Sequence, residues 1–163
     1  MAWPSGAVMS RAAEVLRLAR AKGWMIATAE SCTGGLVAAA LTDVPGSSDV
    51  FDRGFLTYSY PAKVAMLGVR QDTLDAVGAV SEEVARQMAE GACEASDAVL
   101  SVAITGVAGP GASGSKPEGL VHFATTSPTG TVHSVKEFGP LGREAVRRAS
   151  VDHALELLLD RLI

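Results

Sequence analysis

The sequence predicts an α/β domain, a three-layer α/β/α sandwich around a mixed sheet of about five strands. Helix-like and strand-like patterns alternate through the first part of the 163 residues, which favours parallel strands joined by helices. Residues 98–105 are almost wholly apolar, as expected of a central strand buried on both faces. The last two strand patterns flank a turn at residues 127–130, which predicts an antiparallel hairpin. We therefore expect a sheet that is parallel early and antiparallel late, in one domain of residues 1–163.

The first four elements follow from the spacing of apolar residues. Residues 8–22 are predicted to form a helix, because apolar side chains recur on one helical face and Gly23 follows as a stop. Residues 24–29 are a short apolar run, typical of a buried strand. Residues 33–42 are mostly small, and we interpret them as a helix. Residues 53–60 are rich in aromatic and β-branched side chains, which favours a strand.

The remaining elements are indicated by their ends. Pro61 is tolerated in a first helical turn and predicts a short helix there. Ser81 precedes two glutamates, as an N-cap residue does, and predicts the next helix. Residues 119–126 and 131–138 are the predicted hairpin strands, and residues 143–162 are the terminal helix. The predicted order is α-β-α-β-α-α-β-β-β-α.

The composition limits the classes of function. Hydrophobic residues make up 48% of the chain and charged residues 20%, which is typical of a globular protein. The net charge of −4 argues against a nucleic-acid-binding protein, and two cysteines fit a reducing cytoplasm. No apolar run approaches the roughly 20 residues that a membrane span needs, and no signal peptide is visible. Three histidines show no metal-ligand spacing, so we expect neither a metal nor a cofactor.

The segment at residues 29–35 (AESCTGG) places Ser31 where a strand ends and a helix begins. Free backbone N–H groups at a helix start can stabilise an oxyanion, and a hydroxyl there is placed for attack on a carbonyl. Glycines such as Gly34 let a ligand approach the backbone closely. Two other interpretations stay open: Ser31 or Thr33 merely caps the helix, or Cys32 is the nucleophile.

Tyr58 and Lys63 follow the second predicted strand and are expected to point toward the same edge of the sheet. A serine nucleophile needs a base, and a desolvated lysine with a lowered pKa supplies one. The alternative is an ordinary surface lysine whose stem lies along apolar neighbours.

A glycine- and proline-rich loop covers residues 106–119 and includes Gly109, Gly111 and Gly114. The segment matches G-x-G-x-x-G formally, but a strand follows it rather than a helix, so it is not a dinucleotide-binding fingerprint. Such a loop at a strand end can wrap a phosphate with backbone N–H groups, or it is simply mobile.

Three arginines stand near the start of the terminal helix, where the helix dipole disfavours cations. Arg143 and Arg147 lie four residues apart on one face, and Arg148 follows them. An anionic ligand would compensate this charge. The alternative is pairing with Glu144 or with solvent.

Four segments of the sequence share an order and spacing with a known family: residues 29–35, Tyr58 with Lys63, residues 78–83 (GAVSEE), and residues 104–110 (ITGVAGP) with 116–119 (KPEG). Together they resemble the CinA C-terminal domain, the competence/damage-inducible family, and the resemblance covers residues 8–162. Characterised members include nicotinamide-nucleotide amidases, which hydrolyse nicotinamide mononucleotide to nicotinate mononucleotide and ammonia in pyridine nucleotide salvage. Longer members carry an N-terminal pyrophosphatase-like domain that is expected to be absent here.

The resemblance implies roles for individual residues. Ser31 would be the nucleophile and Lys63 its base, with Tyr58 and Thr105 assisting in proton relay or orientation. The implied substrate-binding residues are Glu30, Thr33, Gly34, Gly106, Gly109, Gly111, Arg143 and Arg147.

The expected partner is a small nucleotide substrate, with no nucleic acid and no membrane. Helices with small exposed residues favour a homo-oligomer, most simply a dimer. Tyr60 and Ala112 depart from the family, which often has Asn and Gly at these positions. Two alternatives therefore stay open: an amidase acting on another carboxamide, and a non-catalytic nucleotide-binding module.

Overall fold

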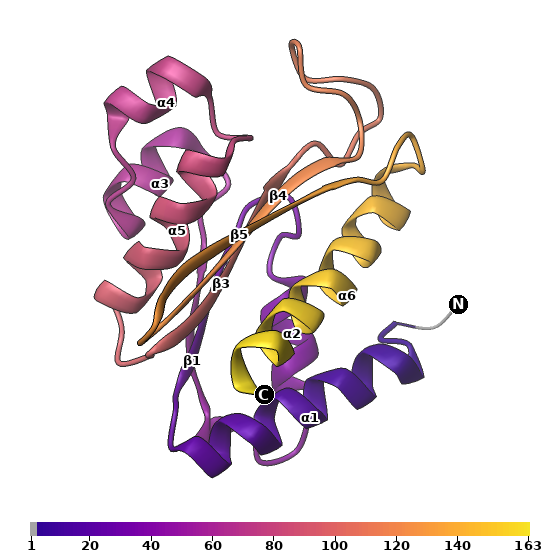
Figure 1. Cartoon of the computed structure of the whole chain (residues 1–163). Coiled ribbons are helices and arrows are strands. Elements are labelled where there is room, and N and C mark those ends of the chain that lie inside the picture. The colour runs from indigo at the N-terminus through magenta and orange to yellow at the C-terminus, as the bar shows by residue number, and fades with distance from the viewer. Residues whose placement is uncertain (1–2) are drawn as a thin grey trace.

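A computed structural model describes residues 3–163, which form a five-stranded sheet between two layers of helices (Figure 1). The predicted three-layer fold is confirmed. The strands are β1 (Ile26–Glu30), β2 (Phe51–Leu56), β3 (Leu100–Gly106), β4 (Leu120–Ser127) and β5 (Gly130–Glu137). The helices are α1 (Gly6–Lys22), α2 (Leu36–Thr42), α3 (Tyr60–Leu67), α4 (Gln71–Val77), α5 (Glu82–Glu94) and α6 (Arg143–Leu162), with a 3-10 turn η1 (Ser47–Asp49).

The sheet order is β2-β1-β3-β4-β5. Strand β1 pairs in parallel with both β2 and β3, whereas β3, β4 and β5 pair antiparallel. The expectation of a sheet that is parallel early and antiparallel late is therefore confirmed. In parallel strands the carboxyl ends meet at one edge, so the residues that follow β1, β2 and β3 come together there.

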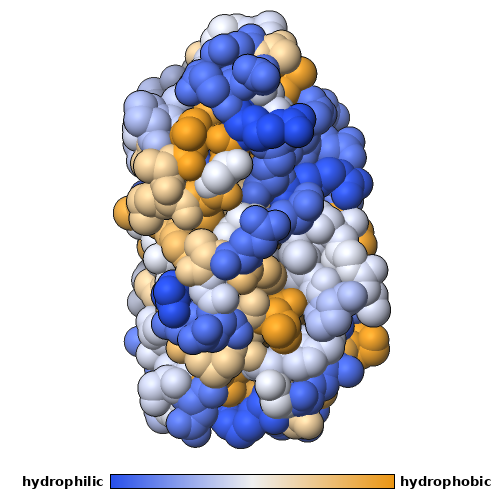
Figure 2. Space-filling model, turned by 90° about the vertical axis from the view of Figure 1, so that its left-hand side faces the viewer, coloured by the Kyte–Doolittle hydropathy of each residue, from blue (hydrophilic) through white to orange (hydrophobic). Residues whose placement is uncertain are grey.

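The two faces of the sheet differ in the size of their side chains. One face presents residues such as Ile26, Leu100 and Val102 to α1, α2 and α6. The other presents alanines such as Ala103 to α3, α4 and α5. On this second side, a Cβ placed on Gly91 of α5 would lie 1.9 Å from the Leu67 carbonyl oxygen of α3. The small residues thus let the helices of this layer approach closely. Figure 2 shows this side of the molecule, where hydrophobic residues are interspersed with hydrophilic ones.

Helix ends follow the sequence signals at several places. The Ser5 hydroxyl caps α1 by accepting a hydrogen bond from the Val8 N–H, and Gly23 ends it in a left-handed conformation, φ 70°. Ser59 and Ser81 cap α3 and α5 in the same way as Ser5. The predicted helix starts near Pro61 and after Ser81 are confirmed.

Two local predictions are wrong, and two short elements are missing from the predicted order. Helix α2 begins at Leu36 rather than near residue 33, because Gly34 and Gly35 are left-handed, with φ of 61° and 100°. Strand β2 ends at Leu56, so Tyr58 stands in the turn after it. Helix α4 and the turn η1 were not predicted. Helix α4 has seven residues, of which only Thr73 and Leu74 are buried, so its sequence shows too little periodicity to be recognised.

The glycine-rich loop between β3 and β4 extends beyond the sheet at the same end as the start of α6 (Figure 1). The carboxyl edge of the parallel strands is therefore enclosed by the loop, by α6 and by α3. Across residues 3–163, no helix is long and apolar enough to cross a membrane.

Candidate active site

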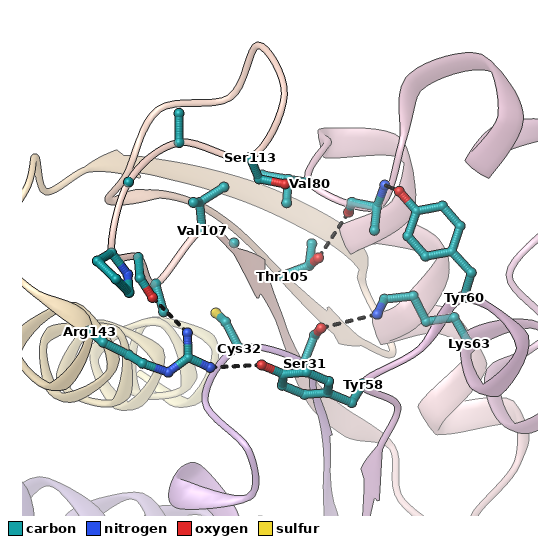
Figure 3. Close-up of a pocket in the computed structure, with 17 residues that line it drawn as sticks. Ser31, Cys32, Tyr58, Tyr60, Lys63, Val80, Thr105, Val107, Ser113 and Arg143 are labelled. Atoms are coloured by element: carbon teal, nitrogen blue, oxygen red, sulfur yellow. Dashed lines mark hydrogen bonds between the residues drawn. The ribbon is translucent and has the colours of Figure 1, made fainter.

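A cavity of about 350 Å³ opens at this edge of the sheet (Figure 3). Its lining comes from the turns after β1 and β2, the start of α3, the segment before α5, the end of β3, the glycine-rich loop and the start of α6. Ser31, Tyr58, Lys63, Thr105 and Arg143, far apart in the sequence, all line it. The structure thus brings together the four residues expected to be catalytic and one of the expected arginines.

Lys63 and Ser31 form the central polar contact of the cavity. The Lys63 side chain is only 1% exposed, and its Nζ donates hydrogen bonds to Ser31 Oγ at 3.0 Å and to the Thr57 carbonyl oxygen at 2.7 Å. Burial lowers the pKa of Lys63 from 10.5 to about 8. The alternative of a solvated surface lysine is wrong.

The absence of a nearby carboxylate explains why the ammonium form of Lys63 is not stabilised. None of the described residues that line the cavity is an aspartate or a glutamate. Without a carboxylate partner, the cost of desolvating the ammonium outweighs the hydrogen bonds, and the pKa of Lys63 falls. The same absence, together with Arg143, makes the cavity suitable for an anionic ligand.

Glu30 lies behind the cavity and organises the turn that holds Ser31. Its side chain is 1% exposed, and its carboxylate accepts hydrogen bonds from Thr33 Oγ1 at 2.6 Å and from the N–H groups of Val37 and Ala38, both at 2.9 Å. A buried carboxylate at the start of a helix is stabilised by the free N–H groups there. Glu30 is therefore the cap of α2, and the alternative that Ser31 or Thr33 caps this helix is wrong.

Arg147 holds the same turn from the other side. Its guanidinium donates to the carbonyl oxygens of Cys32 at 3.0 Å and Thr33 at 3.3 Å. A Cβ on Gly34 would lie 2.9 Å from Arg147 Nη2, so the glycine makes room for the arginine. The Gly34 N–H donates to the Ser31 carbonyl, so it is not free to bind an oxyanion. The structure places Glu30, Thr33, Gly34 and Arg147 outside the cavity lining.

Arg143 bridges two walls of the cavity. It donates to the Gly109 carbonyl oxygen at 2.7 Å and to the Tyr58 hydroxyl at 2.8 Å, as Figure 3 shows. The hydroxyl of Tyr58 therefore contacts Arg143 rather than Ser31. Gly106, Gly109 and Gly111 line the cavity as expected. The alternative of pairing with Glu144 applies to Arg148, which lies 2.8 Å from that carboxylate.

Thr105 and Tyr60 fix the opposite wall. Thr105 Oγ1 donates to the Ala79 carbonyl oxygen at 2.9 Å, and the Ala79 N–H donates to the Tyr60 hydroxyl at 3.1 Å. Lys116 Nζ donates to the next carbonyl, that of Val80, at 2.8 Å. The segment at residues 78–80 is thus held from β3, from α3 and from the glycine-rich loop. The sequence singled out Tyr60 only as a departure from the family, and it gave no signal for the wall that this residue supports.

Cys32 lines the cavity but is only 6% exposed. Burial raises the pKa of its thiol to about 12, so the thiolate does not form near neutral pH. This argues against Cys32 as the nucleophile.

The histidines lie away from this cavity. His122 and His133 face each other across the β4–β5 hairpin, with 2.9 Å between His122 Nδ1 and His133 Nε2. His153 packs edge-on against Phe123. Within residues 3–163, no three or more His, Cys, Asp or Glu side chains are grouped so as to hold a metal ion.

The chain is similar to known proteins over nearly its whole length. The family model described as CinA C-terminal domain matches residues 9–162. The nicotinamide-nucleotide amidohydrolase PncC of Escherichia coli K12 is 45% identical over 157 residues, which are 96% of this chain and 95% of that protein. PncC of Enterobacter agglomerans is 47% identical over 145 residues, or 88% of each chain. The crystal structure of competence/damage inducible protein CihA from Agrobacterium tumefaciens aligns with a TM-score of 0.94 at 48% identity, covering 98% of both chains.

Proposed function

The chain belongs to the CinA C-terminal domain family, and we propose that it is a nicotinamide-nucleotide amidohydrolase in which Ser31 is the nucleophile and Lys63 its base. The reaction would convert nicotinamide mononucleotide and water to nicotinate mononucleotide and ammonia. The observation that carries the assignment of residues is the 3.0 Å contact between Ser31 Oγ and the buried Lys63 Nζ.

The first half of the reaction forms an acyl-enzyme. Neutral Lys63 takes the proton of Ser31 Oγ while the oxygen attacks the carboxamide carbon, and the carbonyl electrons move onto the oxygen. Collapse of this tetrahedral intermediate breaks the C–N bond, and Lys63 gives its proton to the leaving nitrogen, which departs as ammonia.

The second half returns the enzyme to its starting state. Lys63 takes a proton from water, the hydroxide attacks the ester carbon, and the acid product leaves as Ser31 Oγ regains a proton. The oxyanion in both halves needs N–H donors near Ser31. The Cys32 and Thr33 amides are the candidates, since the Gly34 amide is engaged with the Ser31 carbonyl. One such donor contributes roughly 3 kcal/mol to transition-state stabilisation.

Recognition of the nucleotide is assigned to the outer part of the cavity. Arg143 and the backbone at Gly106 and Gly109 would hold the phosphate, because a guanidinium and glycine-rich backbone both suit phosphate oxygens. Gly111 would shape this part of the cavity, since its N–H donates to Glu118. Tyr58 would orient Arg143 through its hydroxyl, and Thr105 would fix the wall beside Ser31.

The test is ammonia release from nicotinamide mononucleotide by the wild-type protein and by Ser31→Ala. We expect release by the wild type only, with both proteins showing the same circular dichroism spectrum. Release by folded Ser31→Ala at the wild-type rate would refute Ser31 as nucleophile. If the folded wild type releases no ammonia, a panel of other carboxamides separates an amidase of different specificity from a binding module, because only the former turns over.

We also propose that the protein is a single cytoplasmic domain that forms a homodimer. The two cysteines are unpaired, which fits a reducing compartment. Val132 and Val135 on the edge strand β5 are 53% and 46% exposed, which provides apolar surface for a second copy. Light scattering coupled to size-exclusion chromatography measures the oligomeric state directly.

A further inference from the structure

Glu118 joins the two segments that form the outer wall of the cavity. One carboxylate oxygen accepts a hydrogen bond from the Gly111 N–H at 2.6 Å, and the other accepts one from the Gly142 N–H at 3.0 Å. Gly111 belongs to the glycine-rich loop, and Gly142 directly precedes Arg143 at the start of α6. We propose that Glu118 is a positioning residue that holds the loop and Arg143 at the spacing needed to bind the substrate phosphate, an inference that rests on the proposed function.

The loop is packed directly onto this carboxylate. A Cβ placed on Gly109 would lie 2.5 Å from Glu118 Cδ, and Gly109 has a φ of 94° that favours glycine. Gly109 is also the residue whose carbonyl oxygen accepts the bond from Arg143. Glu118 and Arg143 therefore hold the same turn, one through the Gly111 amide and the other through the Gly109 carbonyl.

A carboxylate suits this position for a chemical reason. Both partners are N–H donors, and an ionised carboxylate offers only acceptors on both of its oxygens. Glutamine has one acceptor oxygen and one NH₂ group, so it can satisfy only one of the two amides without placing donor against donor. Hydrogen bonds to an ionised group are also stronger than neutral ones.

Glu118 does not line the cavity, so it acts through the loop and through Arg143 rather than on the substrate. The reacting pair, Ser31 and Lys63, is held by other contacts, on Thr57 and on the turn after β1. Loss of Glu118 should therefore weaken the binding of the phosphate group and leave the chemical step intact.

The experiment compares Glu118→Ala, Glu118→Gln and Glu137→Ala with the wild type. Glu137 is an exposed glutamate at the end of β5 with no side-chain hydrogen bond among the described residues, so its variant controls for loss of charge. Each protein is assayed with nicotinamide mononucleotide and with nicotinamide riboside, which lacks the phosphate. Hydrogen exchange of residues 107–118 and 142 is measured in the ligand-free proteins.

We expect Glu118→Ala to raise KM for the nucleotide about tenfold, as loss of charge-assisted hydrogen bonds does. We expect kcat for the nucleotide and kcat/KM for the riboside to stay within about twofold of the wild type, since neither depends on the phosphate site. The KM of Glu118→Gln for the nucleotide should lie between those of the wild type and Glu118→Ala, and Glu137→Ala should match the wild type. Hydrogen exchange at residues 111 and 142 should be faster only in the Glu118 variants. If the alanine variant does not fold, Glu118→Gln makes the same comparison.

An equal loss of kcat/KM for the nucleotide and for the riboside in Glu118→Ala would overturn the proposal, because it would show that Glu118 supports the whole site. Unchanged kinetics in both Glu118 variants would overturn it as well. If the wild type hydrolyses neither substrate, the proposed function fails. The role of Glu118 is then tested by measuring the binding of nicotinamide mononucleotide to each variant by calorimetry. Binding that is weaker in Glu118→Ala than in Glu137→Ala supports the proposal, whereas equal binding or none overturns it.

Discussion

The buried amine of Lys63 predicts a pH dependence for the reaction. A base must be neutral to accept the Ser31 proton, and burial lowers the pKa of Lys63 from 10.5 to about 8. With this pKa, roughly a tenth of the molecules carry a neutral Lys63 at pH 7 and roughly nine tenths at pH 9. A lysine with the ordinary value would be neutral in only about 3 molecules in 10,000 at pH 7. Burial therefore raises the fraction of competent enzyme at pH 7 by about 300-fold.

The assay is kcat/KM for nicotinamide mononucleotide from pH 6 to pH 10. The acid product is measured by chromatography, so the protonation of ammonia does not affect the readout. We expect kcat/KM to rise about tenfold between pH 7 and pH 9 and then to level off. Cys32 does not contribute to this profile, because the pKa of its thiol is about 12.

The control is the circular dichroism spectrum of the protein at each pH, which separates loss of the fold from titration. A profile that is flat between pH 7 and pH 9, in protein that stays folded, would refute Lys63 as the base. A rise that begins only near pH 10 would refute the argument that burial lowers its pKa.

Substitutions at Lys63, Glu30, Arg143 and Gly91 test further contacts described above. Lys63→Met should abolish turnover yet raise the free energy of unfolding at pH 7 by about 1–3 kcal/mol in urea titrations, because the folded state then no longer holds a desolvated ammonium. The wild type should gain stability as the pH rises from about 8 to 10.5, where the unfolded lysine still binds a proton and the folded one does not, and the methionine variant should lack this gain. Glu30→Gln should lower the free energy of unfolding by about 2 kcal/mol, since one buried amide loses its charged acceptor, and an unchanged urea midpoint would contradict its role as the cap of α2. Arg143→Ala should raise KM for the nucleotide about tenfold with little change in kcat. An equal rise in KM for the phosphate-free riboside would argue against phosphate binding by Arg143. Gly91→Ala should lower the melting temperature despite alanine's higher helix propensity, at a cost of about 1–3 kcal/mol, because its Cβ would meet the Leu67 carbonyl oxygen.

The sequence determined the parts of the fold that depend on local patterns. The amphipathic spacing of α1, the serine caps of α3 and α5, and the apolar run of β3 each have a signature within a few residues. The sequence also predicted that Ser31 and Lys63 lie at the same edge of the sheet. They follow β1 and β2, and parallel strands bring their carboxyl ends to one edge.

Short elements escaped prediction for a physical reason. Helix α4 has seven residues, of which two are buried, so it presents no full apolar stripe. Helix α2 was predicted, but it begins three residues later than expected. The start of α2 is set by the left-handed backbone of Gly34 and Gly35, and the missing side chain of Gly34 makes room for Arg147 from the distant helix α6.

The roles of the polar residues around the site were decided by the tertiary structure alone. Glu30 and Arg147 were expected to bind substrate, but they hold the turn of Ser31 from behind. Glu118 gave no signal in the sequence, because its partners, Gly111 and Gly142, are backbone amides on two different segments. The sequence by itself determined which residue types stand near the sheet edge. Only the packing of distant segments decided which of them meet, because burial and hydrogen-bond partners depend on residues far apart in the chain.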